Sequence, residues 1–320
     1  MVNYLTVNLR RGELSGSGPR STKRTVSLFI AFRFNATESI KFRESIDQKL
    51  SSTISLRDVE VLDGKAVLLG EDWSGKIRDL LKRAKLVVAD LTALSPEVVF
   101  ECGYALGVGR QVLPVVADPS WYNRLPRWLT TLQIGCFGNE EGWNSILDTI
   151  DKCLNKGQLP KQDFRPSPPD PGQSLWLPGP EWFAPRAESL VNVANRFDMN
   201  TPEIHTLQSD LEDAYKNVLE QASKASLIVA AVDNTPADAF VHYLSGLVVS
   251  KPKAGVSRRK LERRVLIVVN DATKPENILC DSARRAHKVV HVTTLAGLND
   301  ELLKFGESYR RWRKDCEGSQ

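Results

Sequence analysis

The stretch that decides the fold is Ala84–Val116, AKLVVADLTALSPEVVFECGYALGVGRQVLPVV. It opens with an apolar run that ends in an acid, Asp90, and it continues through a short loop into an apolar segment that carries Glu101 and several glycines. Residues 111–116 form a second apolar run. Short apolar runs on either side of a longer helical segment predict strand, loop, helix and strand, the repeating unit of a parallel α/β sheet.

Glu101 is the unusual residue of this stretch, because it lies one turn into the predicted helix among apolar neighbours. Open parallel sheets bind their ligands at the carboxyl ends of the strands, where this helix starts. A partly desolvated carboxylate at that edge is a candidate catalytic group. An acid near a helix start is also favoured by the helix dipole alone, so spacing leaves both interpretations open.

The same alternation of strands and helices extends over the first half of the chain. Besides the central stretch, strands are predicted at 26–32, 59–62 and 132–137, and helices at 36–50, 71–83 and 142–154. This order implies a doubly wound parallel sheet with helices on both faces.

Two segments break the alternation. Residues 1–24 are rich in Gly, Ser and Arg, and we expect a flexible arm or an added strand there. Residues 157–184 are rich in proline and predict a semi-rigid linker. Trp176, Trp182 and Phe183 favour packing of part of this linker on a domain surface, or its use as the first strand of the next unit.

The second half repeats the first in a degenerate form. Lys224–Ala230, KASLIVA, parallels Arg83–Ala89, RAKLVVA. Aligning the two places Ala231 and then Val241 or His242 where the first half has its two acids. A lone histidine on such a helix is more often a packed residue than a general base. We therefore expect a noncatalytic copy that senses a ligand or mediates assembly.

The predicted fold class is α/β, with two tandem doubly wound parallel-sheet domains of Rossmann-like or flavodoxin-like type at 25–156 and 185–320. A chain of 320 residues has the length of two domains, and 42% hydrophobic residues suffice for two cores. The net charge of +4 is too small to indicate nucleic acid by itself. The basic run 258–264 could grip phosphate, although such runs are usually solvated faces.

The five cysteines show no C-x-x-C pair and no metal-ligand spacing, so we expect free thiols in a reducing compartment and no metal site. The amino terminus has no signal-peptide apolar core, and no apolar run is long enough for a membrane span. These features predict a cytoplasmic protein without a membrane partner.

The residues Ala89–Thr92, Ser95–Gly107 and Arg110–Val116 together resemble the signature of the nucleoside 2-deoxyribosyltransferase superfamily, especially its bacterial TIR-like branch. Members cleave or exchange the N-glycosidic bonds of deoxynucleosides, nucleotides or NAD, and some only bind. The resemblance implies that Glu101 is the catalytic glutamate and that NAD or another nucleotide is a substrate, with no cofactor. In bacteria it also implies a role in nucleotide-depleting defence against phage.

The chain departs from the smaller transferases at Ser95 and Pro96, where an acid-rich loop often precedes the motif. This difference favours hydrolysis or binding over deoxyribosyl transfer. A noncatalytic nucleotide-binding sensor or scaffold is the competing function. TIR-like units commonly complete their sites by packing against a neighbour, so we expect a homo-oligomer or a complex with another protein.

The chemistry of N-glycosidic cleavage assigns roles to the acids. An ionised Glu101 would stabilise, or attack, the positive charge that develops at the anomeric carbon. A neutral base departs better when protonated, and Asp90 or Glu97 could supply that proton, whereas nicotinamide needs no acid. Asp90 could instead bind ribose hydroxyls or cap the loop that follows it.

Other strand ends supply the candidate substrate contacts. Arg33 follows the first strand and could hold a phosphate or a carboxylate, or form a surface salt bridge. Trp73 precedes the helix beside the motif, and its indole could stack on a base or fill a hydrophobic gap. The predicted substrate-binding residues are Phe32, Arg33, Asn35, Asp72, Trp73, Ser95, Glu97 and Tyr104.

Overall fold

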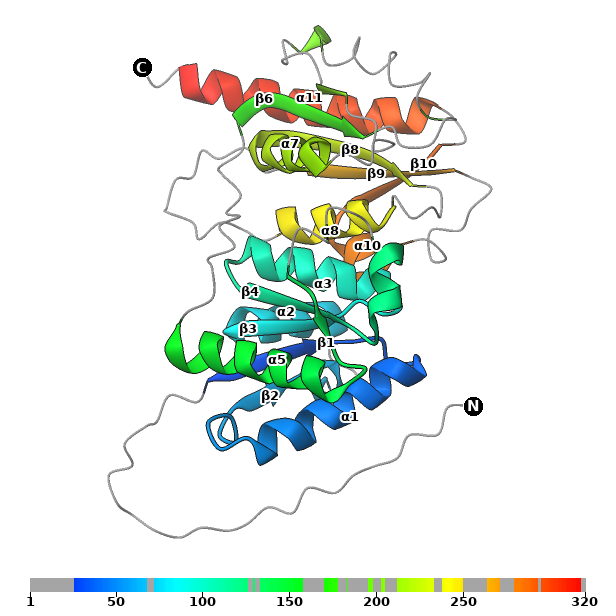
Figure 1. Cartoon of the computed structure of the whole chain (residues 1–320). Coiled ribbons are helices and arrows are strands. Elements are labelled where there is room, and N and C mark those ends of the chain that lie inside the picture. The colour runs from blue at the N-terminus through cyan, green and yellow to red at the C-terminus, as the bar shows by residue number, and fades with distance from the viewer. Residues whose placement is uncertain are drawn as a thin grey trace, which may run out of the picture.

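The computed structural model contains two α/β units stacked one on the other (Figure 1). It describes residues 26–67, 72–125, 129, 133–157, 170–177, 183, 195–197, 203–204, 212–232, 238–249, 264–270, 279–292 and 295–317. The predicted arm at 1–24 lies outside these residues.

The first unit is a five-stranded parallel sheet in the order β2-β1-β3-β4-β5. Its elements are β1 (Ser27–Ala31), α1 (Thr37–Ser52), β2 (Glu60–Leu62), η1 (Gly64–Ala66), α2 (Trp73–Arg83), β3 (Leu86–Asp90), α3 (Pro96–Gly107), β4 (Gln111–Val116), η2 (Pro119–Arg124), β5 (Gly135–Cys136), α5 (Glu140–Asp151) and η3 (Lys152–Lys156). This is the flavodoxin-like doubly wound order, in which the strand order reverses between β1 and β3.

Local sequence explains these elements. Every residue of β3 is buried, as a central parallel strand with helices on both faces requires. In α2, Ile77, Leu80 and Leu81 form one buried face, and burying each such side chain contributes about 1.5–3 kcal/mol. Pro96 occupies the first turn of α3, where its missing N–H costs nothing.

The second unit is also a five-stranded parallel sheet, in the order β10-β9-β8-β6-β7. Its elements are β6 (Asp170–Leu177), β7 (Glu203–Ile204), α7 (Glu212–Lys224), β8 (Ala225–Val232), α8 (Asp238–Val249), β9 (Arg264–Asn270), α10 (Asp281–Ala286), β10 (Lys288–Val292) and α11 (Leu295–Glu317). Taken in chain order, its strands have the same arrangement as those of the first unit. The prediction of two tandem doubly wound parallel sheets is confirmed.

Within the predicted linker at 157–184, residues 170–177 form β6, which pairs with β8 in the interior of the sheet. A spacer is therefore wrong over these residues, and the alternative prediction, that part of this segment supplies the first strand of the next unit, is confirmed. Leu175, Trp176 and Leu177 are fully buried, so this segment supplies core rather than a spacer. The pairing with β8 is irregular between Asp170 and Ser174, next to Pro171, which cannot donate to a ladder.

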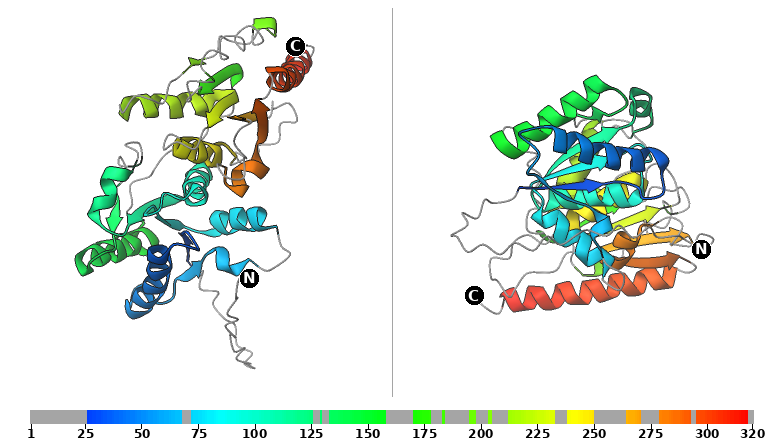
Figure 2. Two further views of the ribbon diagram at one scale, coloured as in Figure 1. Left: turned by 90° about the vertical axis from the view of Figure 1, so that its right-hand side faces the viewer. Right: turned by 90° about the horizontal axis from the view of Figure 1, so that it is seen from below.

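The two units face each other through their helices. In the first unit, α1 and α5 pack on the outer face of the sheet, while α2 and α3 cover the inner face. In the second unit, α11 lies on the outer face, and α7 and α8 lie on the inner face. One continuous buried cluster includes side chains from α2, α3, α7 and α8, so the units share a core. Figures 1 and 2 show α3 and α8 lying between the two sheets.

Helices α3 and α8 cross at two glycines. A Cβ on Gly103 would overlap the carbonyl oxygen of Tyr243, and a Cβ on Gly246 would overlap that of Phe100. The two contacts are equivalent: adding 143 to the residue numbers converts Gly103 into Gly246 and Phe100 into Tyr243. The crossing is therefore isologous, as in a two-fold symmetric dimer.

The same shift places Leu244 at the position of Glu101. The predicted match with Val241 or His242 is wrong, because the pseudo-two-fold contact places the two helices in a different register from the sequence alignment. The second unit still has no acid at this position.

Candidate functional site

Asp90 ends β3 at the carboxyl edge of the sheet and is 1% exposed. Its Oδ1 accepts a hydrogen bond from the Thr92 N–H at 2.9 Å, so the proposed loop-capping role is confirmed. The Thr92 hydroxyl in turn accepts the Ala117 N–H at 2.9 Å. The other oxygen of Asp90, Oδ2, is buried without a hydrogen-bond partner among the described residues. One carboxylate oxygen holds the loop, and the second makes no hydrogen bond within the part of the chain that the structure describes.

The loop between β3 and α3 carries a strained residue. Leu94 has a φ of 43°, in the left-handed region that residues other than glycine rarely adopt. Ser95 follows it, is buried, and donates from its hydroxyl to Oε2 of Glu97 at 3.0 Å. Strain of this kind persists where surrounding structure holds it, often at binding sites.

Glu97 and Glu101 lie one turn apart on the same face of α3. Glu97 is exposed, and Glu101 is partly exposed. Burial, together with the smaller effect of the negative charge of Glu97, raises the pKa of Glu101 to about 8. The expectation of an ionised Glu101 is therefore corrected: at neutral pH its carboxyl is mostly protonated, because the surrounding apolar atoms disfavour the charge.

Tyr104 lies two turns along α3 from Glu97, about 10 Å in a regular helix. Its ring is buried, and burial raises the pKa of its hydroxyl, while nearby Lys82 and Arg78 of α2 act in the opposite direction. Tyr104 thus lies beside the second half of α2, two turns from Glu97 but only one turn from Glu101.

An aromatic shelf lies at the end of β1 and the start of α2. We define it as Phe32, Phe34 and Trp73. The ring centroids of Phe32 and Phe34 are 4.7 Å apart, and those of Phe34 and Trp73 are 5.6 Å apart with an edge-on geometry. Phe34 and Trp73 are 42% and 37% exposed, which is high for such large apolar rings. A Cβ on Gly64 would lie 2.7 Å from the Phe34 ring, so glycine lets the shelf rest on the backbone.

Cations border this shelf. The Lys65 ammonium lies 5.6 Å from the Phe32 ring centroid. Arg33 is exposed, and its Nε donates to Oδ1 of Asn35 at 2.8 Å. Phe34 and Lys65 were missed by sequence reasoning. The alternation Phe32, Arg33, Phe34 after an apolar strand could have indicated Phe34, but no sequence signal links Lys65 to this edge.

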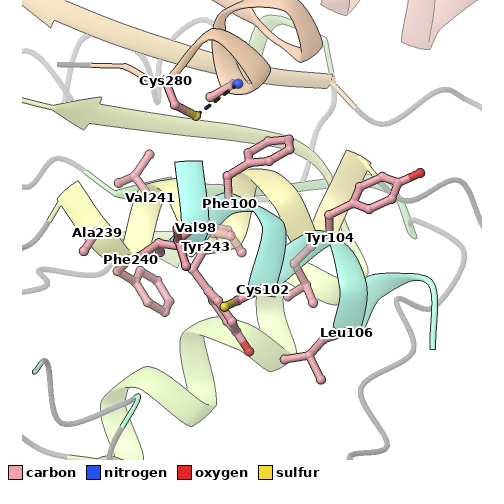
Figure 3. Close-up of a cluster of buried hydrophobic side chains, with 14 of the residues drawn as sticks. Val98, Phe100, Cys102, Tyr104, Leu106, Ala239, Phe240, Val241, Tyr243 and Cys280 are labelled. Carbon is pink, nitrogen blue, oxygen red and sulfur yellow. Dashed lines mark hydrogen bonds between the residues drawn. The ribbon is translucent and has the colours of Figure 1, made fainter. Parts of the chain in front are cut away.

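The second unit reaches the same site through α10. The Ser282 hydroxyl lies 3.2 Å from that of Ser74, and Nη1 of Arg285 lies 3.2 Å from Oδ1 of Asp72. Cys280, at the start of α10, is close enough to Glu97 and Glu101 for their charges to act on its thiol. Figure 3 shows Cys280 beside the apolar cluster that α3 and α8 form. These contacts join residues about 200 positions apart, and sequence reasoning missed them.

The described part of the chain shows no group of three or more His, Cys, Asp or Glu side chains that could hold a metal ion. Its cysteines Cys102, Cys136, Cys153 and Cys280 carry free thiols. Within the same residues, no helix is both long and apolar enough to cross a membrane.

Comparisons with known proteins add no family. No protein-family model matches the chain, and no curated protein matches it. One similar solved structure is a probable two-component system response regulator/GGDEF domain protein, 11% identical, with a TM-score of 0.29 over 89% of this chain and 99% of that chain. Another is an ABC transporter, LacI family transcriptional regulator from Brachyspira murdochii, 13% identical, with a TM-score of 0.22 over 92% and 90%. These TM-scores are too low to support an argument about function.

Proposed function

We propose that the first unit cleaves the N-glycosidic bond of a nucleotide, with NAD as the leading substrate. The observation that carries the proposal is Glu101, a partly buried carboxyl on the helix that follows the central strand. Ligands of doubly wound sheets bind at this edge. The resemblance of the surrounding motif to the nucleoside 2-deoxyribosyltransferase superfamily supports a catalytic role for this residue.

In the proposed reaction the bond between the anomeric carbon and the base nitrogen breaks, and its electron pair leaves with the base. Positive charge develops at the anomeric carbon, which an ionised Glu101 would stabilise until water adds there and releases a proton. Nicotinamide leaves from a cationic state and accepts the electron pair without protonation. Bound beside Glu101, its positive ring would also favour the ionised carboxylate. A neutral base needs a proton to leave and does not favour the ionised Glu101 carboxylate. The raised pKa of Glu101 therefore supports NAD over a neutral nucleoside as the substrate.

The aromatic shelf supports a substrate with a planar ring and phosphates. The exposed rings of Phe34 and Trp73 present apolar area for stacking. Arg33 and Lys65 beside them carry the charges that phosphate oxygens require. Asp90 Oδ2, buried and without a hydrogen-bond partner in the described part of the chain, is suited to accept a bond from a ribose hydroxyl. Depletion of NAD by such an enzyme would make it an antiviral defence effector in a bacterial cell.

A second candidate is nucleotide binding without turnover. The specific observation in its favour is again the raised pKa of Glu101, because a protonated carboxyl can donate a hydrogen bond to a ligand but cannot stabilise a cation. In that case the chain would act as a sensor or a scaffold subunit.

The first test is a substrate panel. Purified full-length protein is incubated with NAD, with deoxynucleosides and with nucleoside monophosphates, and free base is followed by chromatography. We expect nicotinamide release from NAD at a rate well above that from the neutral nucleosides. Nucleotide binding by calorimetry without release of any base between pH 6 and 9 would instead establish the binding function.

The pH dependence gives a second test. The profile of kcat/KM reports ionisations of the free enzyme, so NAD cleavage is expected to rise with pH through about 8 as Glu101 loses its proton. Glu97→Gln removes the adjacent negative charge and is expected to move the midpoint to lower pH. Glu141→Gln, exposed on α5 across the sheet, is the matched control. Identical midpoints for the wild type and Glu97→Gln would contradict the assignment of Glu101.

A further inference from the structure

The helix α10 is the part of the second unit that lies against the candidate site. Its Ser282 and Arg285 both contact the start of α2, through Ser74 and Asp72. The Arg285–Asp72 pair is exposed on both sides, with 57% and 63% of the side chains accessible. Such pairs contribute little to stability, so a ligand can replace either partner at small cost.

The amino-terminal end of α10 lies beside the acids of α3. Cys280 caps this end, its Sγ accepting the Ala283 N–H at 3.4 Å, and it is 2% exposed. Burial raises the pKa of the Cys280 thiol to about 12, with the charges of Glu97 and Glu101 as smaller contributions. The Cys280 thiol is therefore uncharged, and it is a weakly polar neighbour of the Glu97 and Glu101 carboxyl groups.

The other end of α10 is held by the second unit. The ring of His287 directly follows the helix, and its Nε2 lies 3.1 Å from the carbonyl oxygen of Ser245 on α8. Helix α8 in turn crosses α3 at Gly103 and Gly246 without room for a side chain, so His287 links α10 to the helix that packs against the acid-bearing α3.

We propose that the candidate site is built by both units, with a nucleotide bound between Glu101 and α10 and with its phosphate held by Arg285. The nucleotide chemistry rests on the proposed function. Arg285 is a charged, accessible guanidinium beside Asp72 at the start of α2, and its fork of N–H groups matches phosphate oxygens. The second unit, which has Leu244 in place of the acid, then supplies binding rather than catalysis.

The first experiment compares Arg285→Gln and Arg285→Lys with Lys304→Gln. Lys304 is an exposed cation of α11, on the outer face of the second sheet, with a similar ion pair to Glu301. For Arg285→Gln we expect KM for NAD to rise at least tenfold with kcat and melting temperature almost unchanged. Arg285→Lys should show a smaller rise, because it keeps the charge but not the fork, and Lys304→Gln should match the wild type.

The second experiment places an ionisable carboxyl at Cys280. Asparagine and aspartate both cap helices, but only Cys280→Asp adds a group that can carry negative charge beside Glu97 and Glu101. We expect the pH midpoint of kcat/KM to move upward in Cys280→Asp relative to Cys280→Asn. If Cys280→Asp does not fold, the KM values of the Arg285 variants alone test the two-unit site.

Equal KM values for Arg285→Gln and Lys304→Gln, or higher turnover when α10 is altered, would overturn the two-unit site. Calorimetry with NAD separates this inference from the proposed function. If the wild type binds NAD without releasing nicotinamide, and Arg285→Gln weakens that binding, the glycosidase proposal fails while the two-unit site stands.

Discussion

Replacing Glu101 with glutamine is expected to abolish base release while leaving the fold intact. Glutamine has the size of glutamate but cannot carry the negative charge that the developing cation requires. Loss of one electrostatic group costs other enzymes about 100- to 1,000-fold in kcat, and we expect a loss at the upper end of this range or beyond. Release of nicotinamide by chromatography measures the effect, with circular dichroism as the check on folding.

Stability provides an internal control for this variant. The folded-state pKa of Glu101, about 8, lies above its ordinary value of 4.5, so the folded protein holds the proton more tightly than the unfolded chain. The stability that this group contributes is present below pH 4.5 and is lost as the pH rises to about 8. Glu101→Gln should therefore unfold at higher denaturant concentration than the wild type at pH 8.5. Full turnover by a folded Glu101→Gln protein would reject the catalytic assignment.

Replacing Gly246 with valine is expected to destabilise the chain by at least about 3 kcal/mol and to reduce activity without touching a catalytic residue. A side chain at Gly246 would overlap the backbone carbonyl of Phe100, which cannot rotate away as a flexible side chain could. Since Phe100 directly precedes Glu101, separation of the helices also displaces the acid. Denaturant unfolding and NAD cleavage on the same samples measure both effects.

The pseudo-two-fold crossing supplies matched variants. Gly103→Ala should destabilise to a similar degree as Gly246→Ala, because the two glycines make equivalent contacts. Gly109 has a φ of 74°, but a Cβ added there would meet no atom within 4 Å, so Gly109→Ala should show only the smaller cost of an unfavourable backbone conformation, about 1 kcal/mol. An unfolding free energy of Gly246→Val within about 0.5 kcal/mol of the wild type would contradict the close crossing.

The crossing also bears on assembly. The sequence predicted that the site is completed by packing against a neighbour, and the structure shows α8 of the same chain covering one face of α3. A homo-oligomer or a complex with another protein stays a prediction. Light scattering over a range of protein concentrations, together with specific activity, would measure it.

Much of the fold could be predicted from the sequence because its signals are local. The fully apolar runs 86–89 and 112–116 each require burial on both faces, and with a helix between them they specify parallel strands. The same pattern placed Glu101 on the helix after the central strand. Over β6 the sequence left a linker and the first strand of the next unit as alternatives, because prolines dominate the segment, whereas Leu175–Leu177 are placed by pairing with a strand about 50 residues away.

By itself, the sequence determined the fold class, the lack of a matching acid in the second unit, and the place of Glu101 at the sheet edge. Tertiary structure alone decided the protonation of Glu101, the register that makes Leu244 the equivalent of Glu101 in the second unit, and the approach of α10 with Cys280 and Arg285. The physical reason is the separation along the chain over which each interaction acts. Periodicity and turn residues act over a few positions along the chain, whereas desolvation, helix crossing and ion pairing depend on which surfaces, distant in sequence, are buried against each other.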